Sequence, residues 1–336
     1  MINNNIILYI CDNRKKGMNK QEILLKEIRS KILDSSSINE EIAIALKISY
    51  DAAHRRVSGK SKISIEETIA LCNYFSISMD NIFFNQNKIV VEKTIEITSQ
   101  KDMLTYFNQS AESIALLTSS EETLMYYSAK DIPLFYFMEG SIMSKFKAYV
   151  WINLLSTTTQ KNNFEDFVIS ESFMQVMLKL KKAYEKVKIK EVWNDTTINS
   201  SLQQILYFYQ AGLLNYNSAN SLLNELKNIL EIIKQKCNNP NSKFSLYYNE
   251  LILLNNNVLF ETNNRLTLFV PYTLLGYFIT KDKESCENVE NFFKQQIKNS
   301  IPLNSTGIRE QNQFFNKMNR KIDYFSSQIK NEMDII

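Results

Sequence analysis

The sequence predicts a mainly α-helical protein of two domains with a small β component. The chain has 336 residues, which is long for one compact domain and sufficient for two. Its 6 Gly and 4 Pro are far fewer than average usage gives, and so few helix breakers favour long helices. Apolar residues recur at helical spacing over most of the chain, whereas the strongest β signal is confined to residues 258–269.

Residues 18–87 are expected to form a small domain of five helices. Apolar residues from Ile23 to Ile32 recur on one face of the first helix. A capping box, with Ser64 three residues before Glu67, opens the fourth helix. The five helices are expected at 21–33, 38–46, 49–57, 65–75 and from Ser78 or Asp80 to near Phe84.

Residues 1–17 are expected to be a flexible, poorly packed tail, and Met18 is a candidate for the true initiator. The apolar patch at 6–10 precedes its basic residues, which is the reverse of a signal peptide. The longest apolar run, 268–279, is shorter than the roughly 18 residues of a membrane span. The 4 cysteines form no C-x-x-C pair, which favours reduced thiols. We therefore expect a cytoplasmic protein without a membrane segment.

Residues 88–336 are expected to form a larger and mostly helical domain. Helices are expected at 102–117, 131–155 with an interruption near Gly140, 165–190, 200–214, 219–237, 283–300 and 306–334. Short strands are expected at 89–97 and 124–127. Two further strands, within 258–269, flank Asn263 and Asn264, which tolerate the positive φ angles of a type I′ hairpin.

Charge and composition restrict the chemistry of the chain. The net charge of +3 is close to balanced, so any nucleic-acid site must be a local patch. The single His nearly excludes histidine-based metal sites and catalytic triads. No nucleophile–base pair, metal cluster or phosphate loop is recognisable. We therefore expect no catalytic residue, no metal ion and no cofactor, and we do not expect an enzyme.

One basic window stands out between Lys47 and Lys62. It holds five Lys or Arg residues against one acidic residue, Asp51. This concentration suits the neutralisation of nucleic-acid phosphates. The alternative is a solvated helix face, since basic clusters on helices are common.

The run from Ser37 to Val57 resembles the helix-turn-helix of lambda-repressor-like (XRE-type) transcriptional regulators. The positions that such a motif buries carry apolar residues, namely Ile42, Ala43, Leu46, Ile48, Ala53 and Val57. The resemblance covers residues 20–84. Two positions depart from the family: Lys47 stands where the family usually has Gly, and Arg56 where it often buries Val or Ile. We expect modest backbone strain at Lys47, and we expect the Arg56 side chain to swing out towards phosphate.

The resemblance implies a recognition helix from Ser49 to Ser58. Contacts to DNA bases are expected from Tyr50, Asp51, His54 and Arg55. Contacts to DNA phosphates are expected from Lys47, Ser49, Arg56, Lys60 and Lys62. Arg55 can read guanine O6 and N7 through its paired donors.

The expected function is therefore a sequence-specific regulator of transcription whose partner is double-stranded DNA. A helix-turn-helix module reads about half a site, so we expect a homodimer on a two-fold related sequence. Residues 88–336 would dimerise and would also take an unidentified effector or protein partner. The alternative is a protein-interaction adaptor, in which the helical C-terminal domain binds a protein and the helix-turn-helix only tethers it.

The C-terminal domain offers one aromatic segment of interest, residues 131–137. This segment and the start of the hairpin at 256–258 resemble uncharacterised bacterial regulators, which adds architecture but no chemistry. Together with Phe146, Tyr149 and Trp151, the segment either lines a ligand pocket or packs as a helix–helix core.

Overall fold

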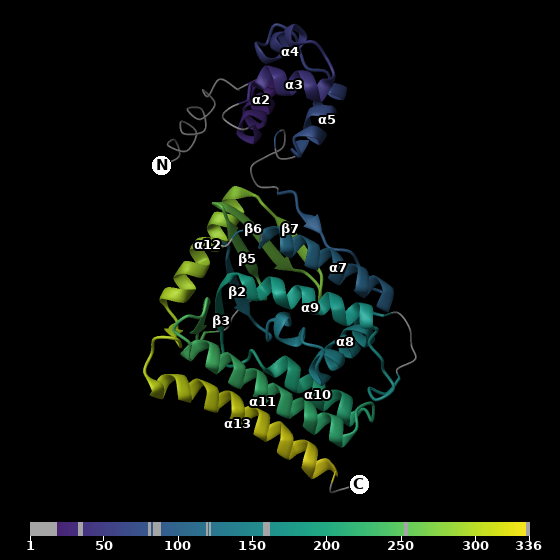
Figure 1. Ribbon diagram of the computed structural model, residues 1–336, viewed down its shortest axis with the longest axis vertical. Helices are drawn as coiled ribbons and strands as arrows, with labels where there is room; N and C mark the ends of the chain where they lie inside the picture. The colour runs from purple at the N-terminus through teal and green to yellow at the C-terminus, as the bar shows by residue number, and fades with distance from the viewer. Residues whose placement is uncertain are drawn as a thin grey trace, which may run out of the picture. The chain divides into compact units, whose positions relative to one another are not determined.

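The computed structural model describes residues 19–32, 36–79, 82, 89–118, 120, 122–156, 162–251 and 255–333. The chain divides into two compact units between Val90 and Val91 (Figure 1). The sequence places this boundary after residue 87. The expected tail at 1–17, the candidate initiator Met18 and the end of the fifth helix near Phe84 lie outside the described residues.

The first unit consists of short helices that begin at capping residues. They are α2 (Lys20–Lys31), α3 (Ile38–Leu46), α4 (Tyr50–Val57) and α5 (Ile65–Tyr74). Asn19 and Ser64 form capping boxes with Glu22 and Glu67, so the N-cap N–H and the N3 N–H of α2 and α5 have side-chain partners. These four helices lie where the sequence predicts them.

The core of the first unit joins all four helices. The fully buried apolar side chains are Leu24, Leu25, Ile28, Ile42, Ala53, Leu71, Cys72 and Ile77. Ile42 of α3 and Ala53 of α4 are both 0% exposed. Ala53 is small, so α4 can lie close against its neighbours. The other positions that the motif must bury, such as Leu46 and Val57, are half-buried against the same cluster.

The second unit is built on an eight-stranded mixed sheet. Its strands are β1 (Glu92–Lys93), β2 (Leu124–Ala129), β3 (Lys188–Trp193), β4 (Phe244–Tyr248), β5 (Val258–Thr262), β6 (Arg265–Pro271), β7 (Tyr277–Thr280) and β8 (Ile301–Pro302). Their order is β1-β7-β6-β5-β2-β3-β4-β8. The prediction of a mainly α protein with one small hairpin is therefore wrong, because this unit is an α/β fold.

The fold-class prediction failed mainly in the central strands of the sheet. β2, β3 and β4 are parallel, and β2 and β3 are covered by protein on both faces, so their residues do not alternate between apolar and polar. The predicted helix over 165–190 ends in the structure at Lys186, and Lys188 begins β3. β4, β7 and β8 are absent from the sequence prediction. The hairpin is confirmed: β5 and β6 pair around Asn263 and Asn264, whose φ angles are 50° and 60°.

Helices cover the two faces of the sheet unequally. They are α7 (Gln100–Leu117), α8 (Ile142–Leu155), α9 (Glu171–Lys186), α10 (Asn199–Gln210), α11 (Tyr216–Asn238), α12 (Lys283–Lys298) and α13 (Ile308–Met333), with a 3₁₀ turn η2 (Leu134–Phe137). The single helical region expected at 131–155 is thus η2 followed by α8, with Gly140 between them at φ 78°.

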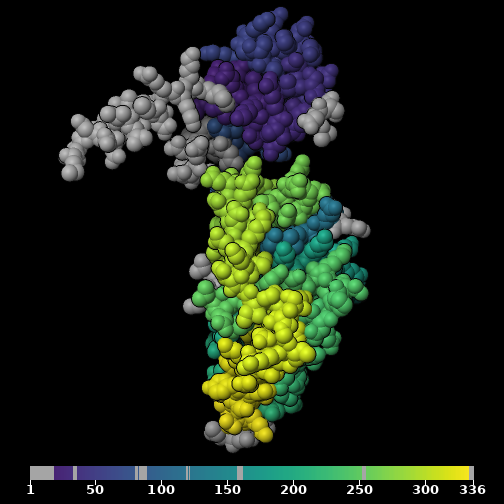
Figure 2. Space-filling model, turned by 90° about the vertical axis from the view of Figure 1, so that its left-hand side faces the viewer, coloured from purple at the N-terminus to yellow at the C-terminus, as the bar shows by residue number. Residues whose placement is uncertain are grey.

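Alternate side chains of β2 show which helices lie on which face. Met125 and Tyr127 belong to the large core formed with α7, α8, α9, α10 and α11. Tyr126 points to the opposite face, where Cys286 and Phe293 of α12 cover it. In Figure 1, α12 lies on one side of the strands, and α7 and α9 lie on the other. Figure 2 shows α12 and α13, coloured yellow-green and yellow, along one face of this unit.

Two crossovers bring the carboxyl ends of the parallel strands to one edge. The chain passes from β2 to β3 through η2, α8 and α9, and from β3 to β4 through α10 and α11. The turns after β2 and β3 therefore meet at the same edge of the sheet. Crevices at the carboxyl ends of parallel strands are where open α/β sheets most often bind ligands.

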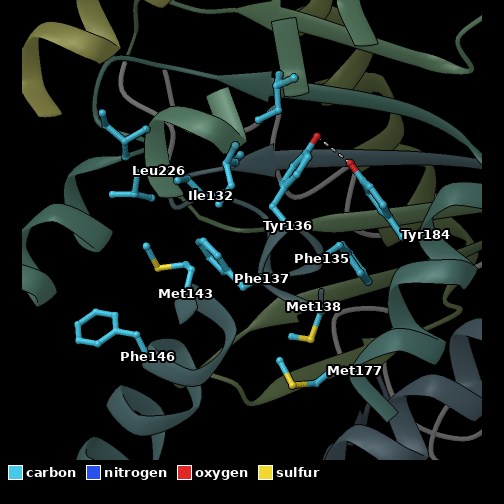
Figure 3. Close-up of a cluster of buried hydrophobic side chains, with 14 of the residues drawn as sticks. Ile132, Phe135, Tyr136, Phe137, Met138, Met143, Phe146, Met177, Tyr184 and Leu226 are labelled. Atoms are coloured by element: carbon cyan, nitrogen blue, oxygen red, sulfur yellow. Dashed lines mark hydrogen bonds between the residues drawn. The ribbon is translucent and has the colours of Figure 1, made fainter. Parts of the chain in front are cut away.

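The large core is rich in aromatic residues around η2. Phe135 stacks on Tyr184 of α9, with ring centroids 4.6 Å apart. The hydroxyls of Tyr184 and Tyr136 lie 3.0 Å apart, within hydrogen-bond distance, and Figure 3 shows both rings within one buried cluster. In the part of the chain that the structure describes, no helix combines the length and the apolar character that crossing a membrane requires.

Candidate nucleic-acid interface

The turn between α3 and α4 sets the angle of the two helices. Lys47 adopts the left-handed conformation at φ 54°, which is the strain expected where a non-Gly residue replaces Gly. The backbone N–H of Ile48 donates to the carbonyl of Ala43 at 3.0 Å, and this closes the end of α3. The Lys47 side chain is left exposed.

α4 presents a polar face to solvent. The hydroxyl of Ser49 accepts a hydrogen bond from the backbone N–H of Ala52 at 3.3 Å and so caps the helix. On its buried side, α4 packs against the core of the first unit through Ala53. The structure brings the predicted base contacts together on the opposite face, and all of them are exposed: Tyr50, Asp51, His54 and Arg55. Their spacing of one, four and five residues places them on a single helical face.

Exposed lysines lie at both ends of α4. Lys47 precedes the helix, and Lys60 and Lys62 follow it in the segment before α5. Three lysines therefore flank the four polar side chains of α4. This is the arrangement that groove binding requires, with cations beside a face of hydrogen-bonding groups.

The structure places Arg56 differently from our expectation. Its guanidinium pairs with the Glu67 carboxylate of α5, with Nε 3.0 Å from both Oε1 and Oε2. Nη1 also donates to the carbonyl of Ala52 at 3.0 Å. The hydrogen bond from Arg56 is the main reason that the pKa of Glu67 is lowered, and the same bond raises the pKa of Arg56. Arg56 thus joins α4 to α5, so we leave it out of the interface proposed below.

Sequence reasoning missed Gln21 of α2. Its Nε2 donates to the carbonyl of Arg56 at 2.8 Å and to that of Ser61 at 3.0 Å. Its Oε1 accepts from the backbone N–H of Ile63 at 3.2 Å. The Gln21 side chain therefore hydrogen-bonds to the backbone before and after Lys60 and Lys62 and fixes the position of that segment. No local pattern could indicate this role, because the bonded groups are 35 to 42 residues away in the sequence.

We expect Gln21→Leu to destabilise the first unit by about 1–3 kcal/mol, because the carbonyls of Arg56 and Ser61 and the N–H of Ile63 each lose a hydrogen bond in a half-buried place. Urea unfolding followed by circular dichroism measures the effect on residues 19–90. The matched control is Lys26→Leu on the exposed side of the same helix, which should leave the stability of this unit nearly unchanged. Equal stability of Gln21→Leu and the parent would contradict this role.

A second missed residue is Asn39, on the first turn of α3. Its Nδ2 donates to the Tyr50 hydroxyl at 3.2 Å and lies 3.5 Å from Nδ1 of His54. Asn39 therefore joins two of the four outward side chains of α4.

The comparison of this chain with known proteins adds no evidence to this geometry. No protein-family model, no curated protein and no solved structure matches this chain. Among the described residues, no three His, Cys, Asp or Glu side chains are grouped so that they could hold a metal ion. The assignment of α3 and α4 therefore depends on their own geometry and on the resemblance of residues 20–84 to XRE-type regulators.

Proposed function

We propose that this protein is a sequence-specific DNA-binding regulator and that α4 is its recognition helix. The observation that supports this most is the exposed polar face of α4, flanked by Lys47, Lys60 and Lys62. The major groove admits one α-helix, and each base pair presents a distinct set of donors and acceptors there. A capped helix with four exposed polar side chains on one face matches that geometry.

The side chains of α4 have complementary chemistry. Arg55 offers two parallel donors for O6 and N7 of guanine. Asp51 accepts hydrogen bonds, which suits the exocyclic amine of cytosine. Tyr50 and His54 are linked through Asn39, so they would reach the groove as a pre-organised pair. The lysines and Ser49 would bind phosphates on either side.

The second unit would supply the assembly that a single module lacks. One helix-turn-helix reads about half a site, so a homodimer on a two-fold related sequence would gain the affinity of two half-sites. We place this function in the cytoplasm, where DNA is accessible. Sedimentation of the full chain with and without its DNA site tests the dimer, and a monomer under both conditions would refute it.

The phosphate contacts have a quantitative consequence. Lys60→Ala and Lys62→Ala should each weaken binding to all DNA sequences alike and reduce the slope of log affinity against log salt by about one. Fluorescence anisotropy with a labelled duplex at several salt concentrations measures this slope. Lys281→Ala in the second unit makes the same charge change and should leave the slope unaltered. Unchanged slopes in both test variants would remove the phosphate assignment.

A further inference from the structure

A cavity of about 460 Å³ lies at the carboxyl edge of β2 in the second unit. Its wall comes from the turn after β2, from α8, from the start of α10, from the segment before β5 and from the connection between β6 and β7. The volume is within the range of small-molecule sites. The place is also the one where α/β sheets bind ligands, at the ends of parallel strands.

Lys147 of α8 lines this cavity and is buried, with 2% of its side chain exposed. Its Nζ donates to Oε1 of Gln204 at 2.8 Å and lies 4.6 Å from the ring centroid of Phe137. The nearest acidic group is Asp131, whose Oδ2 is 3.9 Å from Nζ and so beyond hydrogen-bond distance. Burial lowers the pKa of Lys147, and Asp131 opposes that shift.

Packing does not explain a lysine at this place. α8 is buried over most of its surface, and Lys147 stands among Phe146, Ala148 and Tyr149, which are all buried. A buried ammonium costs more free energy than an apolar side chain of similar length. Its three N–H groups have one hydrogen-bond acceptor, Gln204, among the described residues. The ammonium can therefore donate to a bound molecule.

The other residues that line the cavity indicate which class of molecule it binds. α10 begins at the cavity, where Asn199 and Ser200 line it, and Ile198 at its N-cap gives no side-chain cap within the described residues. A helix N-terminus favours negative charge. The lining also carries two lysines, Lys130 and Lys147, against one acidic residue, Asp131, so its net charge favours an anion as well. Trp151 and Tyr272 offer aromatic surface to the rest of the ligand. Asp131 is held by the backbone N–H of Ile132 at 2.8 Å.

We propose that this cavity binds a small organic anion whose carboxylate or phosphate head is held by Lys147 and whose ring packs on the aromatic wall. The sequence left open whether the aromatic residues near 131–151 form a core or a pocket. Phe146 and Tyr149 belong to the core, whereas Phe137 and Trp151 also border the cavity. The inference concerns the second unit and does not depend on DNA binding by the first.

Calorimetric titration of the full chain with benzoate, phenyl phosphate and uncharged benzyl alcohol tests the proposal. We expect saturable binding of one anion per chain, and the alcohol should bind about tenfold or more weakly because a charge-assisted hydrogen bond is lost. Preference for benzoate or for phenyl phosphate assigns the head group. No saturable binding of either anion up to about 10 mM overturns the proposal, as does equal binding of the alcohol.

The variant Lys147→Met removes the ammonium and keeps the length of the side chain. We expect it to fold with unchanged or greater stability and to lose about tenfold or more in anion affinity. Lys145→Met is the matched control on the same helix, because Lys145 donates instead to the carbonyl of Glu165 and should keep full affinity. Full affinity in Lys147→Met would overturn the proposal. If that variant does not fold, the comparison of anion with alcohol on the parent chain decides.

Discussion

Replacing Arg55 by Ala is expected to lower the affinity of the protein for its preferred DNA site by about 5- to 150-fold, which corresponds to about 1–3 kcal/mol. The reason is that Arg55 is exposed on the outward face of α4 and is the one side chain there with paired cationic donors. Weak binding to unrelated DNA should remain, because Lys47, Lys60 and Lys62 are intact. Anisotropy titrations with the selected site and a scrambled duplex measure both affinities.

The matched control for this experiment is Arg309→Ala. Arg309 is an exposed arginine in α13 of the second unit, so the substitution removes the same charge far along the chain. It should leave both affinities unchanged. The role of Arg55 in base recognition would be refuted by an Arg55→Ala variant that binds the selected site as tightly as the parent.

The second large effect concerns a buried acid, Glu191 of β3. It is 0% exposed, and its carboxylate accepts hydrogen bonds from Nε1 of Trp193 at 2.7 Å and from the hydroxyls of Tyr184 and Tyr136. Burial in the core raises the pKa of Glu191 to about 7, although these hydrogen bonds oppose the shift. In the unfolded chain a glutamate has an ordinary pKa of about 4.5.

The stability of the second unit should therefore depend on pH. Because folding raises the pKa of Glu191, its protonated form stabilises the folded state below the unfolded pKa. That contribution is lost as the pH rises from about 4.5 through about 7. The full difference is about 3 kcal/mol. Urea unfolding of the full chain at pH 5 to 8.5, followed by fluorescence of the tryptophans of the second unit, measures it.

The single histidine of the chain simplifies the interpretation of this pH dependence. Its 1 His is His54 of the first unit, so no histidine of the second unit titrates in the same range. Glu191→Gln should flatten the pH dependence, whereas the exposed Glu231→Gln in α11 should keep it. A parent protein with constant stability over this range, or a Glu191→Gln variant with the same slope, would contradict the assignment.

The two helices α3 and α4 and the turn between them were predictable because their determinants are local. The caps at Ser49 and Ser64, the buried position of Ala53 and the turn at Lys47 are all visible within a few residues of sequence. The outward face of α4 follows from the helical period alone. The pairing of Arg56 with Glu67 could not be predicted in this way, because it depends on how α5 packs against α4.

The sheet was mostly not predictable from local patterns. The hairpin of β5 and β6 was found because Asn263 and Asn264 give a direct turn signal. The parallel strands have partners 55 to 64 residues away along the chain, such as Ile189 against Phe244 and Leu124 against Lys188. In β3, moreover, Lys188 and Glu191 continue the charged pattern of α9, so the strand resembled an extension of that helix.

One feature of the sequence indicates that Lys147 is buried, although the sequence prediction did not use it. α8 is mostly apolar and has no distinct polar face, so a lysine in its middle such as Lys147 is expected to be at least partly buried. The same reasoning applies to Glu191, which lies in a strand covered on both faces. The burial of Lys147 and Glu191 can be established only from the fold, because the crossovers decide which faces of α8 and β3 are covered.

Selection from a random pool of double-stranded DNA by the full chain tests the central proposal most directly. We expect convergence on a recurring sequence of two related half-sites, spaced by about one helical turn or a multiple of it. We also expect that binding falls steeply with salt. Retention of no recurring sequence, with binding that does not respond to salt, would contradict DNA recognition by α4 and would favour a protein-interaction adaptor.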